Sequence, residues 1–231
     1  MIEITAWAED FAQKLEGAFG PRLRFVGYQG SYGRGEATAE SDIDMVTVLD
    51  TVGMEELSCY RELVRGMPSG ELACGFICGA GELKKWPRFD GVSLLVDTIP
   101  VRGDLRELLP PLTRRDAWDA LQVGASALYH GACHAWLYGS DPKEALPGLG
   151  KAAFFCLRSW LLCRHQPLVN RKAAMLPLLS SREQGFLRAA DPAWVAALGP
   201  QDVEGLYRGM IGWCQEQLQA VEPQGLQKLA L

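Results

Sequence analysis

Residues 30–50 read GSYGRGEATAESDIDMVTVLD, and this stretch decides most of what the sequence says about fold and function. It opens with Gly30-Ser31, a pair that offers backbone N–H groups and a hydroxyl to a phosphate. Ten residues separate Ser31 from Asp42, and Asp44 follows two positions later, so that both carboxylates point to one face if the segment is a strand. Carboxylates suit Mg²⁺, which usually binds one or two of them together with substrate phosphates. The stretch therefore predicts a phosphate-binding turn beside a divalent-metal site.

The surrounding residues predict a small mixed sheet. Residues 3–19 repeat apolar side chains at helical spacing and end at Gly20-Pro21, as an amphipathic helix does. A short helix is predicted from Ser31, with its N–H groups facing a phosphate, and a longer one at 54–65. Apolar runs predict strands at 23–28, 43–49, 72–78 and 92–99. We expect helices to cover one face of this sheet.

The character of the chain changes after Pro100. Pro110-Pro111 is the strongest boundary signal, and strand-like runs are scarce beyond it. Helices are predicted at 113–123, 149–165, 170–179 and 201–221, and residues 126–138 are ambiguous between helix and strand. The predicted fold class is α/β (α+β), with a mixed-sheet catalytic domain at residues 1–105 and an all-α helical domain at residues 106–231.

The stretch at residues 27–49 resembles the signature of the nucleotidyltransferase superfamily, which includes DNA polymerase beta and kanamycin nucleotidyltransferase. The shared pattern is an apolar residue, Gly-Ser, a spacer and then Asp-apolar-Asp-apolar, and minimal nucleotidyltransferases carry similar runs of Ser-Tyr-small-Arg-Gly-Glu and Ser-Asp-Ile-Asp. The resemblance implies that Gly30 lets the backbone approach a triphosphate and that Ser31 contacts its β- or γ-phosphate. It also implies that Arg34 compensates charge there. The helical half resembles the bundle of antibiotic-modifying members, without an equally sharp motif.

Nucleotidyl transfer expels pyrophosphate by an in-line displacement, which two divalent ions held by three carboxylates can clamp. Asp42 and Asp44 supply two of these catalytic metal ligands. Asp97 is the candidate for the third, because an acid that ends the apolar run VSLLVDTIP needs solvent or a metal partner. A general base would activate the acceptor hydroxyl, and Asp97, Glu71 and Glu82 are all candidates for it.

Composition narrows the class of protein. Hydrophobic residues make up 48% of the 231 residues, no apolar run is long enough to span a membrane, and the first residues lack the basic start of a secretory signal, which predicts a cytoplasmic protein. The seven cysteines form no CxxC pair and are predicted to be buried free thiols. Residues 1–100 hold 16 acids and 9 bases. This acidic half argues against a grip on long nucleic acid and suits a cationic acceptor.

Two further patterns have competing interpretations. Arg158 and His165 form an Arg-x6-His pattern that is similar to the ribonuclease motif of HEPN domains, although a cationic helix end is the simpler explanation. His130 and His134 are spaced i, i+4 and would suit a metal on a helix, but no third ligand stands nearby in the sequence. Both patterns are more simply explained as ordinary helix surface.

The sequence thus predicts Mg²⁺-dependent transfer of a nucleoside monophosphate, AMP from ATP, onto a hydroxyl of a small molecule such as an aminoglycoside-like antibiotic. One alternative is transfer to a protein or RNA end, as in toxin–antitoxin pairs. A second is a non-catalytic module that binds nucleotide. The signature contacts phosphates and not bases, so it does not distinguish ATP from other nucleoside triphosphates. A homodimer is also compatible with the sequence.

Overall fold

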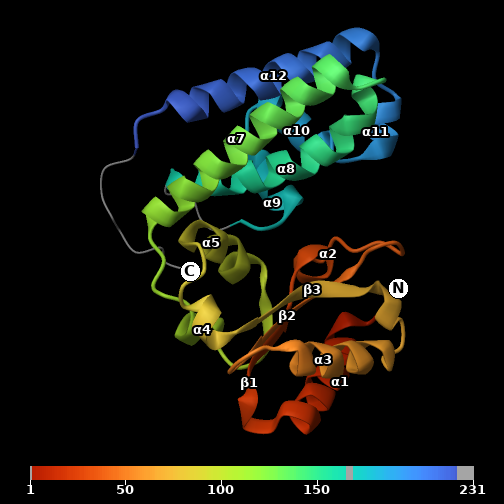
Figure 1. Cartoon of the computed structure of the whole chain (residues 1–231). Coiled ribbons are helices and arrows are strands. Elements are labelled where there is room, and N and C mark those ends of the chain that lie inside the picture. The colour runs from red at the N-terminus through yellow and green to blue at the C-terminus, as the bar shows by residue number, and fades with distance from the viewer. Residues whose placement is uncertain (1, 165–168, 223–231) are drawn as a thin grey trace. The chain divides into compact units, whose positions relative to one another are not determined.

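The structure is a computed structural model that describes residues 2–164 and 169–222 (Figure 1). The chain divides into two compact units, and the division falls between Leu112 and Thr113. The sequence placed the boundary after residue 105. The difference arises because helix α6 (Leu105–Leu108) and the adjacent Leu109 pack into the core of the first unit.

The first unit is built on a four-stranded mixed sheet with the order β3-β2-β1-β4. Strands β1 (Leu23–Tyr28) and β2 (Ile43–Leu49) have the predicted bounds and pair antiparallel, while β3 (Ala73–Gly79) runs parallel to β2 and β4 (Ile99–Arg102) antiparallel to β1. Helix α1 (Ile4–Phe19) and the 3₁₀ turn η1 (Gly20–Arg22) precede β1, and α2 (Gly30–Arg34) connects β1 to β2. The ends of β1 and the starts of β2, β3 and β4 therefore share one end of the sheet.

Helices cover both faces of this sheet, so the prediction of helices on one face was wrong. Alternate residues of β1 and β2 enter two different apolar clusters: Val26 and Met45 join α1, whereas Phe25 and Val46 join Leu94 and Leu105 on the other face. Helix α1 contacts α3 (Met54–Arg65) on the first face (Figure 1). The second face receives α4 (Ala80–Leu83), α5 (Arg88–Asp97) and α6. Because both faces of β2 are covered, its sequence is a nearly continuous apolar run and does not alternate with polar residues.

The predicted strand at 92–99 is the clearest error. Residues up to Asp97 form helix α5, and β4 begins only at Ile99. A short apolar run does not by itself separate a buried strand from a buried helix. Here Leu94 enters the core beside Phe25, and the carbonyl of Leu94 accepts a hydrogen bond of 2.6 Å from Thr98 Oγ1 at the end of the helix.

The second unit is all-α in the part of the chain that the structure describes. Helices α7 (Arg114–Tyr138) and α8 (Pro142–Cys163) pack extensively against each other, and α12 (Pro200–Gln219) packs on α7. The ambiguous segment 126–138 is helical, as the second half of α7. Between α8 and α12 lie α9 (Lys172–Met175), the 3₁₀ turn η3 (Leu176–Leu178), α10 (Ser181–Arg188) and α11 (Pro192–Ala196), of which α10 and α11 were not predicted.

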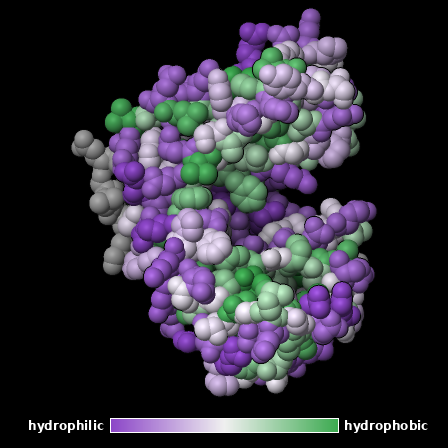
Figure 2. All heavy atoms as spheres, viewed as in Figure 1, coloured by the Kyte–Doolittle hydropathy of each residue, from purple (hydrophilic) through white to green (hydrophobic). Residues whose placement is uncertain are grey.

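On the face shown in Figure 2, hydrophobic residues form small patches among hydrophilic ones. Among the residues described, no helix is both long and apolar enough to span a membrane. All seven cysteines are free, as predicted, but Cys59 and Cys74 are exposed rather than buried. The exposed Cys74 lies on β3.

Candidate active site

Asp42 and Asp44 lie at the start of β2, where the sequence placed them. Asp42 is exposed and directly precedes the strand, and Asp44 is its second residue and is half-buried. In a strand, Asp44 shares a face with Val46 and Val48, which are both in the core beneath α5 and α6. The apolar part of β2 thus fixes the direction in which the Asp44 carboxylate points.

The Gly30 turn packs directly against Asp44. Gly30 has a positive φ of 68°, which favours glycine, and a Cβ built at this position would overlap the Oδ2 atom of Asp44. The backbone N–H of Gln29 also donates a 2.8 Å hydrogen bond to the Asp44 carbonyl. The absence of a side chain at Gly30 therefore leaves the room that the carboxylate occupies.

Ser31 and Arg34 belong to the short helix α2 that follows this turn. The Ser31 carbonyl accepts a 2.8 Å hydrogen bond from the Glu36 N–H, and Arg34 Nε forms a 3.2 Å ion pair with Glu36. This ion pair orients the guanidinium of Arg34, and the Arg34 side chain is largely buried. All three residues predicted to bind phosphate are thus on one turn at the Asp44 end of the sheet.

Asp97 occupies a different position from the one predicted. It is the last residue of α5, rather than part of a strand, and it is only 5% exposed. Its carbonyl oxygen lies close to α2, 3.1 Å from the position of a Cβ built at Gly33. Within residues 2–164 and 169–222, no three His, Cys, Asp or Glu side chains are grouped so as to hold a metal, so the structure does not bring Asp97 together with Asp42 and Asp44.

The side chain that does contact Asp44 is that of Cys74. The two residues are register partners on the parallel strands β2 and β3, and the Cys74 thiol donates a 3.3 Å hydrogen bond to Asp44 Oδ1. Partial burial and the carboxylates of Asp44 and Asp42 raise the pKa of the Cys74 thiol to about 12. Sequence reasoning missed this residue because parallel pairing of residues 30 positions apart leaves no local signal.

The two other candidates for a general base lie at opposite ends of the sheet. Glu71 is exposed in the 3₁₀ turn η2 (Gly70–Leu72) just before β3, at the end where β2 also begins. Glu82 lies in α4, which follows the far end of β3. A strand of seven residues spans about 20 Å. The position of Glu82 therefore argues against a role beside Asp42.

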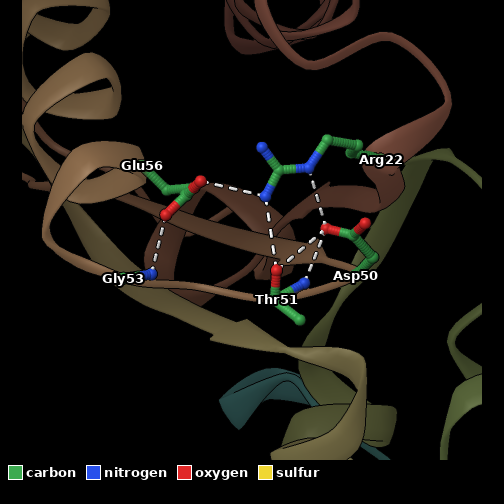
Figure 3. Close-up of polar contacts among 5 residues, drawn as sticks. All are labelled: Arg22, Asp50, Thr51, Gly53 and Glu56. Atoms are coloured by element: carbon green, nitrogen blue, oxygen red, sulfur yellow. Dashed lines mark hydrogen bonds and ion pairs between the residues drawn. The ribbon is translucent and has the colours of Figure 1, made fainter.

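The other end of β2 carries a self-contained ionic network, which Figure 3 shows. Arg22 donates to Asp50 at 3.1 Å, to Glu56 at 2.9 Å and to the Thr51 hydroxyl at 3.3 Å. Glu56 in turn accepts a 2.9 Å hydrogen bond from the Gly53 N–H at the start of α3. The hydrogen bond from Arg22 lowers the pKa of Glu56. This network joins η1 to the segment after β2 and to α3.

The helical unit adds little to a case for a nuclease. Arg158 is 1% exposed in the middle of α8, with its guanidinium over the rings of Phe154 and Phe155. His165 lies outside the described residues. His130 and His134 are exposed on α7, with ring centroids 6.0 Å apart, so their i, i+4 spacing falls on a helix. A buried Arg158 does not suit contact with an RNA substrate.

The fold of this chain is similar to that of solved structures. The chain is similar to the crystal structure of spectinomycin adenyltransferase AAD(9) from Enterococcus faecialis with ATP and spectinomycin, with a TM-score of 0.56 over 91% of this chain and 99% of that one. The chain shares the fold of that structure. Sequence identity is 14%, so the likeness concerns the fold, and it confirms the predicted mixed-sheet and helical architecture. No family model and no curated protein matches the sequence.

Proposed function

We propose that this protein is a cytoplasmic, Mg²⁺-dependent nucleotidyltransferase that moves AMP from ATP onto a hydroxyl of a small molecule such as an aminoglycoside-like antibiotic. The observation that carries the proposal is the packing of the Gly30 turn on Asp44, which unites the two halves of the signature at one end of the sheet. The shared fold supports the reaction class, and the ATP and spectinomycin bound to that neighbour support the choice of nucleotide and acceptor.

The chain's own groups have distinct roles in this proposal. Asp42 and Asp44 would hold Mg²⁺, which suits their hard oxygen donors. The bound ion would supply charge neutralisation at the triphosphate. The Ser31 hydroxyl donates to a phosphate oxygen, and the Arg34 guanidinium, oriented by Glu36, offsets phosphate charge.

Glu71 and Asp97 are the two candidates for the general base. Both lie at the Asp44 end of the sheet, but Glu71 is exposed and Asp97 is buried, so Glu71 is the more accessible to an acceptor hydroxyl. We therefore assign the base to Glu71, with Asp97 as the alternative. A Glu71→Gln variant should lose the acidic limb of the pH–rate profile, and an unchanged limb would shift the assignment to Asp97.

The test is release of pyrophosphate from each nucleoside triphosphate with Mg²⁺, across aminoglycosides, other small antibiotics and short RNAs. Acceptor-dependent release that disappears in Asp44→Asn, but survives in Asp50→Asn, supports the proposal. Asp50 is a matched control because it follows the same strand at its other end. Release with RNA alone would favour the alternative acceptor. Triphosphate binding without release from any acceptor would overturn catalysis and leave a nucleotide-binding module.

A further inference from the structure

Gln29 is a polar residue at the site end of the sheet that has no role in the reaction as described so far. It directly follows β1, and its backbone N–H donates a 2.8 Å hydrogen bond to the carbonyl of Asp44. The pairing of β1 with β2 and β4 places Gln29 opposite Asp44 on one side and opposite Thr98 on the other. Opposed residues of antiparallel strands point to the same face. The side chains of Gln29, Asp44 and Thr98 therefore form one row across the sheet.

The Gln29 amide is anchored through its oxygen, while its nitrogen has no partner in the described part of the chain. The Thr98 hydroxyl contacts Gln29 Oε1 at 3.2 Å and is itself held by the Leu94 carbonyl at 2.6 Å. A Cβ built at Gly27 would lie 2.7 Å from the Ile99 carbonyl oxygen, so β1 and β4 approach closely at this point. The Gln29 side chain is only half-buried, and its NH₂ group makes no hydrogen bond within residues 2–164 and 169–222. The amide thus offers oriented N–H donors beside Asp44.

The chemistry of this donor favours a phosphoryl oxygen over the acceptor hydroxyl. An amide NH₂ group only donates, and the amide oxygen is already engaged by Thr98. A donor placed on the attacking hydroxyl would occupy a lone pair that the attack requires, whereas a phosphoryl oxygen carries negative charge and only accepts. Neighbouring strands lie about 4.8 Å apart, so the amide lies one strand spacing from Asp44. Ser31 and Arg34 lie beyond Gly30 in α2, where they suit the outer phosphates.

We propose that Gln29 donates a hydrogen bond to a nonbridging oxygen of the α-phosphate and that Thr98 positions the amide for this contact. The inference rests on the proposed function, because it concerns the phosphate that is attacked. In that step the acceptor oxygen bonds to the α-phosphorus, and its proton passes to the general base. The bond from the α-phosphorus to the pyrophosphate oxygen breaks, and its electron pair leaves with pyrophosphate. A donor fixed at the nonbridging oxygen stabilises charge in this transition state without reorganisation.

The experiment compares Gln29→Met, which keeps the length of the side chain, with Gln13→Met. Gln13 is the matched control because it is exposed on α1 and its amide also makes one hydrogen bond, to Glu9. Single-turnover pyrophosphate release uses ATP and whichever acceptor of the panel above gives the fastest release. Gln29→Met should lower the rate at saturating ATP by at least about 10²-fold and change the affinity for ATP by less than about threefold. Gln13→Met should match wild type in both, and thermal unfolding confirms that each variant is folded.

Sulfur substitution in the nucleotide tests the contact itself. The two diastereomers of adenosine 5′-(α-thiotriphosphate) each replace one nonbridging α-oxygen with sulfur, a weaker hydrogen-bond acceptor. With one diastereomer, Gln29→Met should cost less than about threefold in rate, because the contact is already lost, whereas the other should show the full cost seen with ATP. Thr98→Val should lower the rate with ATP by about tenfold, and Thr98→Ser, which keeps the hydroxyl, should restore it.

The outcomes separate this inference from the proposed function. A wild-type rate in Gln29→Met, or an equal cost with ATP and both diastereomers, overturns the contact with the α-phosphate. If Asp44→Asn is inactive while Gln29→Met keeps its rate, the proposed function stands and this inference alone fails. If wild type releases no pyrophosphate with any acceptor, the proposed function fails, and the inference fails with it.

Discussion

Carboxylates lie at both ends of strand β2, but only those at one end are paired with a cation among the described residues. At the end of the strand, Asp50 and Glu56 share the guanidinium of Arg22 (Figure 3). At the start, no ion pair involves Asp42 or Asp44 among the residues that the structure describes, and the contact of Asp44 is a neutral thiol. Negative charge left without a cation at one end of a sheet costs stability and suits a ligand that brings positive charge. The contrast separates a structural end from the end that we propose to be functional.

The largest effect should follow from removing charge at the functional end. Asp42→Asn and Asp44→Asn should each lower the rate of pyrophosphate release by at least about 10³-fold, because a metal ligand stabilises charge in the transition state. Neither should lower the melting temperature, because each relieves repulsion between like charges. Thermal unfolding and single-turnover kinetics measure both. A folded Asp44→Asn enzyme with the wild-type rate would show that the comparison of the two ends misplaces the site.

Gly30 offers the next test, since its missing side chain creates the space for Asp44. Gly30→Ala adds a Cβ that overlaps Asp44 Oδ2 at a positive φ, so both the rate and the melting temperature should fall. Gly17→Ala is the matched control, because nothing lies within 4 Å of a Cβ there. It lies within helix α1, so this change should stabilise by up to about 1 kcal/mol. Equal melting temperatures for the two variants would contradict the packing of the turn on Asp44.

The sequence predicted the elements around the proposed site well where local pattern determines structure. The bounds of β1, β2 and α3 follow from apolar runs between turn residues. The Gly-Ser and Asp-x-Asp motifs lie close together because antiparallel pairing places the end of β1 beside the start of β2. Asp97 was misplaced because its apolar run packs as a buried helix, which a strand pattern resembles. Cys74 could not be predicted, since its partner is fixed only by the pairing of β2 with β3.

We expect a different phenotype from a substitution at the structural end of β2. Arg22→Met removes the cation shared by Asp50 and Glu56, so the melting temperature should fall, while the rate with saturating substrates should stay within about twofold of wild type. Differential scanning calorimetry and pyrophosphate release together check this split. A large loss of rate at an unchanged melting temperature would mean that the Arg22 network also serves the reaction, and the distinction between the two ends would fail.

The smallest effect concerns how stability depends on pH at the structural end. Glu56 has an ordinary pKa of 4.5 when unfolded, and Arg22 lowers it in the folded protein, so the ion pair stabilises fully above pH 4.5. This contribution is lost as the pH falls through the lowered value, because the folded protein must then take up the proton. Glu56→Gln keeps an acceptor for the Gly53 N–H and removes only the charge. The difference in melting temperature between wild type and Glu56→Gln should therefore be greatest near neutral pH and shrink below pH 4.5. A difference that stays constant across this range would assign the effect of Glu56 to helix capping instead of the ion pair.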